Sequence, residues 1–225
     1  HHSINPAYID KNYGQIFIIW DKIFGTFQRE IDEGKPIYGT LKPANTWNPF
    51  FINFKHLKQL ILDFFRTKSI FNKVIIWFMP TGWRPEDVKC KYPLKERTKI
   101  KYDTPISLPL VLWSFFQLFI TSIFMFHFLY LFPDNSTQMN YLYAGIILIH
   151  VFSFTSSLDQ KNYSIFAEFS KIILGFYLVS QNNYTWFDIS NALLSLIFLY
   201  SFISLSLTII FYFDSKNKIK HTRLI

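Results

Sequence analysis

Two long stretches without a charged side chain constrain most strongly what this chain can fold into. They cover residues 107–132 and 189–213, which are 26 and 25 residues long. A helix rises 1.5 Å per residue, so about 20 apolar residues cross the hydrocarbon core of a bilayer. Both stretches therefore predict transmembrane helices.

Two weaker apolar stretches predict further spans. Residues 141–158 are uncharged, whereas residues 165–179 carry Glu168 and Lys171. These two charges lie three residues apart, so they can pair on one helix face. We interpret them as a helix end near the membrane surface, with Lys171 extending to the headgroups, and keep a proton or substrate pathway as the alternative. Two histidines inside spans, His127 and His150, are predicted to make polar contacts between helices.

The loops between these stretches predict the orientation of the chain. Residues 133–140 and 180–188 contain no Lys or Arg, whereas residues 89–101 and the C-terminal tail are basic and the middle loop carries Lys161. Basic loops stay on the cytosolic side. We therefore expect a multi-pass protein with residues 1–106 and the C-terminus in the cytosol.

The composition agrees with a membrane protein of two parts. Charged residues are 17% of the 225, below the roughly 25% of a soluble domain. Most of these charged residues come before residue 105, which predicts a cytosolic part over residues 1–104 and a four-span part over residues 105–225. The net charge of +8 lies beside apolar segments and forms no stripe on a soluble fold, which argues against nucleic-acid binding. The single cysteine, Cys90, excludes an internal disulfide and a cysteine-type zinc site.

An apolar pattern over residues 16–27 predicts a helix in the cytosolic part. Its apolar side chains recur at helical spacing and form a stripe that would be buried or pressed against a bilayer. Asp10 or Asn12 would cap its start, because short polar side chains accept from the first free N–H groups of a helix. Asp21 and Lys22 would lie on its solvated face.

A second amphipathic pattern predicts contact with lipid. Residues 54–66 place aromatic and aliphatic side chains on one face and basic ones elsewhere, as in helices that lie on anionic membranes. Residues 74–87 are expected to dip into the same interface and to turn at Pro80 and Gly82. His56 is interpreted as a surface residue.

The chain opens with two adjacent histidines, His1 and His2. Neighbouring side chains on a helix point about 100° apart, so this pair is poorly placed to chelate one ion and better placed to serve two ions of a dinuclear centre. Imidazole binds iron, zinc and copper alike. Asn5, Asp10 and Asn12 are near enough in sequence to orient the rings. From the residues alone, the remnant of a purification tag is the alternative.

The segment that begins at the histidine pair resembles a known membrane-enzyme family. Its pattern is His-His, then Asn-Pro, Asp-x-Asn-Tyr-Gly and Trp-Asp-x-x-Phe-Gly-Thr-Phe. It is similar to the third histidine box of the fatty acid hydroxylase/sterol desaturase superfamily of membrane di-iron oxygenases. Within that superfamily the chain most resembles the alkylglycerol monooxygenase family, through residues 37–39, 42–46, 80–85 and 158–160.

The resemblance implies an all-α protein in the endoplasmic reticulum membrane, with the cytosolic end of a di-iron hydroxylase fold followed by about four transmembrane helices. It implies that His1 and His2 are iron ligands with Asp10 and Asn12 close behind them. It also implies an oxidoreductase that uses O2 and tetrahydrobiopterin to hydroxylate and cleave alkylglycerol ether lipids. Two irons need about eight ligands, so we expect this chain to be an inactive fragment of a longer enzyme.

Two other functions remain open at this point. One is a sterol, sphingolipid or fatty acid hydroxylase of the same superfamily, which would take electrons from cytochrome b5. The other is a non-enzymatic four-span protein with an accidental histidine pair. Histidine clusters upstream in the gene would distinguish the oxygenases from the latter.

Overall fold

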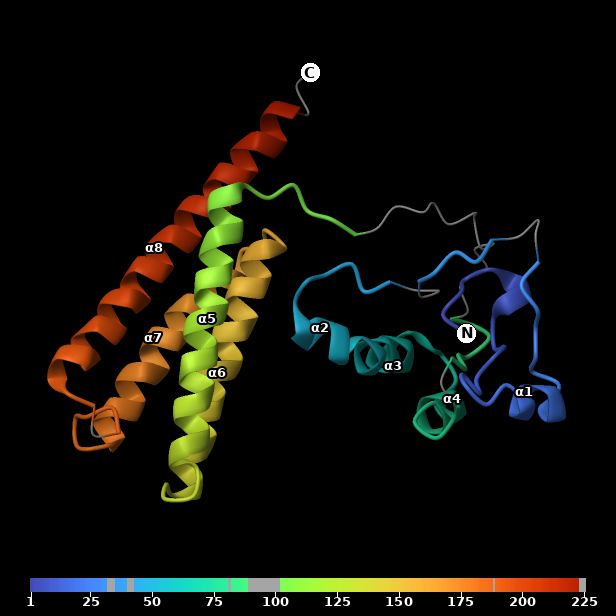
Figure 1. Ribbon diagram of the computed structural model, residues 1–225, viewed down its shortest axis with the longest axis horizontal. Coiled ribbons are helices and arrows are strands. Elements are labelled where there is room, and N and C mark those ends of the chain that lie inside the picture. The colour runs from blue at the N-terminus through green and yellow to red at the C-terminus, as the bar shows by residue number, and fades with distance from the viewer. Residues whose placement is uncertain (32–34, 40–42, 81, 89–101, 188, 223–225) are drawn as a thin grey trace. The chain divides into compact units, whose positions relative to one another are not determined.

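The computed structural model describes residues 1–31, 35–39, 43–80, 82–88, 102–187 and 189–222, with side chains as far as residue 217. Within these ranges the regular structure is helical, apart from two isolated β-bridges, which confirms the predicted all-α class (Figure 1). The chain forms two compact units, one made of His1–Asn45 and Leu60–Tyr102 and the other of Thr46–Gln59 and Asp103–Ile225. Cys90 and the basic stretch 89–101 lie outside the described residues.

The second unit contains four helices that are long and apolar enough to cross a membrane, as predicted. The second of them begins four residues earlier than expected, because the Ser136 hydroxyl accepts from the Met139 N–H and caps the helix there. The fourth continues past its apolar part into the basic tail. The four are α5 (Leu108–Leu131), α6 (Thr137–Leu158), α7 (Tyr163–Gln181) and α8 (Asn191–Thr222).

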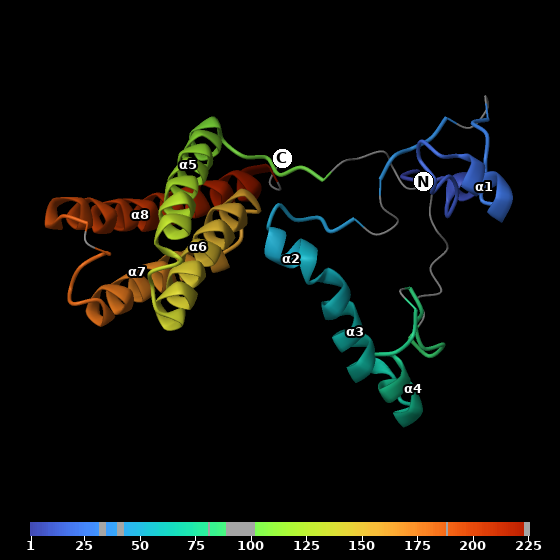
Figure 2. The same cartoon turned by 60° about the horizontal axis from the view of Figure 1, so that its bottom comes forward.

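These helices form a bundle around α6, which contacts α5, α7 and α8, while α7 also contacts α8 (Figures 1 and 2). An apolar cluster closes the end that carries the α5–α6 and α7–α8 loops. There the Tyr143 ring stacks on Phe187 at 5.2 Å and meets Trp186 edge-on at 5.5 Å. The remaining buried members of this cluster are Ile146, Leu178 and Val179.

The bundle has a polar interior and an apolar exterior. Its exposed side chains are largely Leu, Ile and Phe, whereas hydroxyl, amide and charged groups are buried between the helices. Lipid tails are as apolar as leucine, so outward apolar faces cost nothing in a bilayer, and polar groups hold the helices together from inside. The buried polar residues of the four spans include Ser114, Gln117, Thr121, His150, Ser153, Glu168, Lys171, Ser201, Ser204 and Thr208.

A short segment anchors α2 (Pro49–Asn53) to the end of α6. Asp159 accepts from the Trp47 N–H at 2.9 Å and from the Thr46 hydroxyl. Asn48 caps α2 and donates from its side chain to the Ser156 hydroxyl at 2.7 Å. Thr46, which ends one of the two motifs, therefore lies beside Asp159 of the other motif at one end of the bundle, although the two are far apart in sequence.

The first unit has less regular structure than its apolar pattern predicts. In place of a helix over residues 16–27 it has only the six-residue α1 (Ile19–Phe24), which ends at Gly25 with φ +70°. A short 3-10 helix, η1 (Pro6–Tyr8), precedes it. No side chain caps α1, so the predicted capping by Asp10 or Asn12 is wrong. Both of these residues instead adopt a left-handed backbone with φ +56°.

The predicted amphipathic helix is α3 (Lys55–Arg66), followed by α4 (Ile70–Ile75). The fold buries Asp63, which receives two hydrogen bonds of 2.6 and 2.7 Å from the Arg84 guanidinium. The apolar stripe of α3 is exposed instead, at Leu57, Ile61 and Phe65, and so is Phe54 just before the helix. Its contact with lipid stays a prediction.

The expected turn after α4 is confirmed. The Trp83 N–H donates to the Pro80 carbonyl at 3.1 Å, and Gly82 has φ +94°, which favours glycine.

Candidate functional site

The histidine pair lies on an extended segment, not on a helix. The Ile4 N–H donates to the Ile37 carbonyl at 2.8 Å, and the Gly39 N–H donates to the His2 carbonyl at 3.0 Å. The rings of His1 and His2 are nonetheless close, with centroids 4.0 Å apart and planes tilted by 49°. The helical geometry assumed for them is therefore wrong, but both residues are exposed and their rings lie next to each other.

His1 is held by a backbone carbonyl in the way that metal-binding histidines commonly are. Its Nδ1 lies 3.0 Å from the carbonyl oxygen of Asn12. In the tautomer that donates this bond, Nε2 carries a free lone pair, which is the atom a metal would use. Asn12, predicted to lie behind the pair, does contact His1, although through its backbone. Asp10 accepts a hydrogen bond of 2.9 Å from the Tyr13 hydroxyl instead.

Asn12 is itself fixed by three hydrogen bonds. Its N–H donates to the Thr26 carbonyl at 3.0 Å. Its side chain donates to the Gln28 carbonyl at 2.8 Å and accepts from the Gln28 N–H at 3.0 Å. Asparagine tolerates the left-handed backbone that this position needs. The carbonyl that holds His1 is therefore set by the pairing of Asn12 with residues 26–28.

Asp21 joins the two segments that meet at Asn12. Its carboxylate accepts from the N–H groups of Tyr13 and Gly14, both at 2.8 Å, and from the Thr26 hydroxyl at 2.7 Å. The Thr26 hydroxyl, together with these backbone N–H groups, holds the pKa of Asp21 below its usual value, because all three bonds favour the ionised carboxylate. Asp21 is 2% exposed, so the predicted solvated position is wrong.

Gly14 is required by this arrangement. A Cβ at this position would lie 2.7 Å from the Phe17 carbonyl oxygen and 2.8 Å from Oδ2 of Asp21. The sequence does carry a signal for the buried Asp21, because Gly25 and Thr26 follow it by four and five residues. The glycine ends the helix, and the chain then turns so that the Thr26 hydroxyl reaches the Asp21 carboxylate.

The donor set for a metal is incomplete in the described part of the chain. No group of three or more His, Cys, Asp or Glu that could hold a metal occurs there. His1 and His2 fit two of the ligands of a metal centre: both are exposed, and the one hydrogen-bonded ring keeps a nitrogen free. His56, interpreted as a surface residue, is indeed exposed on α3.

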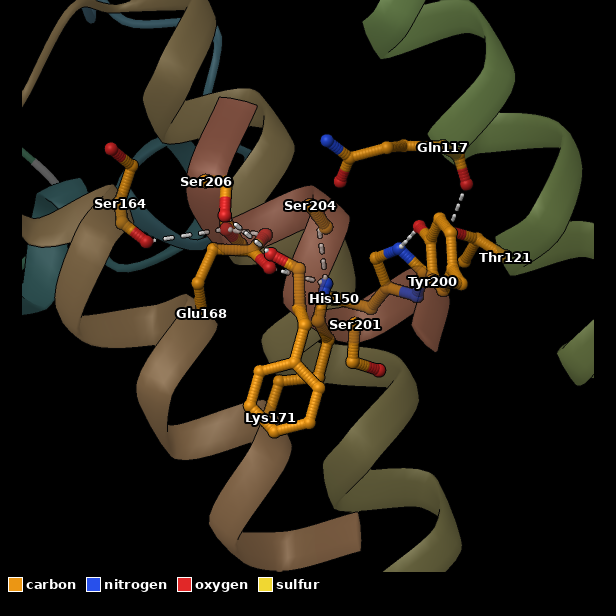
Figure 3. A network of polar contacts seen from close by, with 12 residues as sticks. Gln117, Thr121, His150, Ser164, Glu168, Lys171, Tyr200, Ser201, Ser204 and Ser206 are labelled. Carbon is orange, nitrogen blue, oxygen red and sulfur yellow. Dashed lines mark hydrogen bonds and ion pairs between the residues drawn. The ribbon is translucent and has the colours of Figure 1, made fainter. Parts of the chain in front are cut away.

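A second polar cluster lies inside the bundle (Figure 3). Nζ of Lys171 is 2.7 Å from Oε2 of Glu168, and these side chains are 4% and 0% exposed. Oε1 of Glu168 accepts from the Ser153 hydroxyl at 2.6 Å. The interpretation of Lys171 as a residue extending to the headgroups is therefore wrong, because its ammonium group points into the bundle, where Glu168 neutralises it.

The two histidines within spans make the predicted contacts between helices. Nδ1 of His127 on α5 lies 2.8 Å from the Tyr143 hydroxyl of α6. Nε2 of His150 on α6 lies 2.7 Å from the Tyr200 hydroxyl of α8.

Part of this chain is similar in sequence to one group of enzymes. It is 45% identical over 85 residues to an alkylglycerol monooxygenase of Homo sapiens and 39% identical over 94 residues to one of Caenorhabditis elegans. It is 44% identical over 86 residues to that of Danio rerio. Each match covers 38% of this chain and 19% of the relative, so the chain matches about a fifth of the relatives' length. No family model matches, and no solved structure is significantly similar. The resemblance noted from the motifs is thereby confirmed for that share of the chain.

Proposed function

We propose that the protein is part of a membrane monooxygenase that cleaves the ether bond of alkylglycerols, with His1 and His2 among its iron ligands. The proposal is supported by identities of 39–45% with alkylglycerol monooxygenases over 38% of the chain. The four apolar helices, which make this a multi-pass membrane protein, suit an insoluble lipid substrate that approaches within the bilayer.

A di-iron centre would supply the oxidising power to insert one oxygen atom of O2 at the carbon beside the ether oxygen, with tetrahydrobiopterin giving the two electrons that reduce the other atom to water. The hydroxylated ether is a hemiacetal, which breaks down to a fatty aldehyde and glycerol.

The residues of this chain would act by holding ligands in place. The Asn12 carbonyl would fix the orientation of the His1 ring through Nδ1, which leaves Nε2 for the metal. Asp21 and Gly14 fix the backbone that carries this carbonyl. Further ligands would come from histidines elsewhere in the protein. Asp10 is proposed to act only indirectly, by holding Tyr13.

The location of the protein is proposed from the same resemblance. We place it in the endoplasmic reticulum membrane, with residues 1–106 and the C-terminus in the cytosol, where reduced pterin is available. The basic loops on that side support this orientation.

The nearest alternative is a sterol, sphingolipid or fatty acid hydroxylase of the same superfamily. Product analysis separates the two. Membranes that contain the complete protein should release fatty aldehyde from a 1-O-alkylglycerol when tetrahydrobiopterin is added, and release none without it. Turnover that needs cytochrome b5 and no pterin would favour the alternative enzyme. Absence of any oxidised product, together with absence of iron, would favour a non-enzymatic four-span protein.

A further inference from the structure

The helices α3 and α4 expose apolar side chains that the proposed oxygenase chemistry does not use. Leu57, Ile61 and Phe65 on α3 are exposed. Ile70 and Phe71 on α4 are 80% and 70% exposed, so no described residue covers them. Exposed apolar surfaces of this kind mark sites of contact with a partner or a membrane.

The buried side of α3 shows which way its apolar stripe points. Asp63 is buried and receives both hydrogen bonds of the Arg84 guanidinium. The next residue, Phe64, contacts Trp77 with ring centroids 6.1 Å apart. A helix turns about 100° per residue, so Ile61 lies about 160° from Asp63 around the helix axis. The stripe therefore points away from the residues against which α3 packs.

The exposed charge beside this stripe is positive. The stripe from Leu57 to Phe65 covers an arc of about 80°. Lys58 and Arg66 follow it within roughly the next 100° and are both exposed. Asp63, the acidic residue of α3, is buried. The outer surface of α3 therefore joins an apolar arc to a basic one, which matches acyl chains beside anionic headgroups.

The start of α3 lies at the end of the bundle of spans. Phe51 of α2 contacts Phe152 of α6 and Tyr163 of α7, with ring centroids 5.5 and 5.4 Å apart. Asn48 caps α2 and donates to the Ser156 hydroxyl. The helix α2 and the first residues of α3 belong to the same compact unit as the bundle. Helices that cross a bilayer end among the lipid headgroups, so this anchor brings α3 to the membrane surface.

We propose that α3 lies on the surface of an anionic bilayer, with Leu57, Ile61 and Phe65 among the acyl chains and Lys58 and Arg66 at the lipid phosphates. The exposed apolar residues of α4 extend this contact. The inference goes beyond the proposed oxygenase activity and does not depend on it, since the position of α3 is measured and not turnover.

The test places a polarity-sensitive fluorophore on single cysteines of the complete protein, with its native cysteines replaced by serine. Ile61→Cys puts the fluorophore on the stripe, and His56→Cys puts it at an exposed position about 140° away on the same helix. The nanodiscs contain phosphatidylcholine and phosphatidylserine, with a spin-labelled acyl chain that quenches fluorophores inside the bilayer. The fluorophore at residue 61 should be quenched several times more strongly than the one at residue 56.

A matched pair of charge variants tests whether α3 recognises the headgroups. The quenched fraction at residue 61 gives the equilibrium constant for docking on the bilayer. Lys58→Gln combined with Arg66→Gln should lower this constant about 25-fold, at roughly fivefold per residue. Lys22→Gln combined with Arg29→Gln removes two exposed charges outside α3 and α4 and should leave it unchanged. Unchanged thermal unfolding of both variants establishes that they are folded.

Three outcomes would overturn the proposal. Equal quenching at residues 56 and 61 would mean that the stripe does not enter the bilayer. A fluorophore at residue 61 that is shielded from iodide in the water but not quenched by the lipid would mean that another part of the protein, or a second copy, covers the stripe. Quenching that changes neither without phosphatidylserine nor without Lys58 and Arg66 would mean that the stripe inserts without recognising charge.

Discussion

Replacing Asn12 by alanine tests most sharply how the histidine segment is held. The substitution removes the two side-chain hydrogen bonds to Gln28, at 2.8 and 3.0 Å. Each neutral hydrogen bond contributes about 1 kcal/mol net. Alanine also tolerates the left-handed backbone less well, at a cost of roughly 1 kcal/mol. We therefore expect Asn12→Ala to destabilise the segment by about 3 kcal/mol.

Asn45→Ala separates the two contributions. Asn45 is exposed and also has a left-handed backbone, with φ +51°, but no side-chain hydrogen bond of it is seen in the described structure. This control should lose only the backbone part, about 1 kcal/mol. The remaining difference of about 2 kcal/mol corresponds to a roughly 30-fold change in the equilibrium for local opening.

Hydrogen exchange of the peptides that cover residues 1–28 and 43–48 is the assay. Protection of the Gln28 amide, which donates to Asn12, should fall about 30-fold more in Asn12→Ala than protection of the amides around residue 45 falls in Asn45→Ala. Equal loss in the two variants would refute the reasoning, because it would mean that the side-chain pairing with Gln28 holds nothing.

Three further predictions follow from the first unit. The hydrogen bonds of Asp21 lower its pKa in the folded protein. The ionised carboxylate therefore contributes fully to stability above the ordinary pKa of 3.8, and this contribution is lost as pH falls through the lower folded pKa. Thermal unfolding between pH 6 and 3 should show this loss, and Asp21→Asn should remove that part of the pH dependence. Asp63→Ala should cost about 3–5 kcal/mol in chemical denaturation, because it removes the carboxylate from a largely buried ion pair with Arg84. Asp63→Leu combined with Arg84→Met should recover most of the loss. Anionic lipid nanodiscs should slow hydrogen exchange in α3. Ile61→Glu on the exposed stripe of α3 should reduce this protection, whereas His56→Ala should leave it unchanged. The same protection in both variants would mean that this face of α3 does not contact lipid.

The spans were the most predictable part of this fold. Uncharged length alone sets α5 and α8, because no soluble core needs 24 or more such residues in a row. Their interior was not predictable, because Glu168 and Lys171 are compatible with either a helix end or a bundle core. Only the packing of α6 and α8 against α7 distinguishes the two, and that is a tertiary property.

The first unit shows why an apolar period can mislead. Residues 16–27 have helical spacing, yet the helix is limited to Ile19–Phe24. Asp21 recruits the N–H groups of Tyr13 and Gly14, and Gly25 turns the chain back so that Thr26 reaches the same carboxylate. These side-chain hydrogen bonds override the preference that the apolar spacing expresses. The motif resemblance pointed to the histidine pair, but it could not reveal that a backbone carbonyl orients His1.

The iron content of the complete protein tests the central claim most directly. The measurement is iron per polypeptide after purification of the wild type, His1→Ala, His2→Ala and the exposed-histidine control His56→Ala. The account predicts that the first two variants lose most of the bound iron while remaining folded, and that His56→Ala keeps the wild-type amount. Full iron content in both His1→Ala and His2→Ala would contradict it.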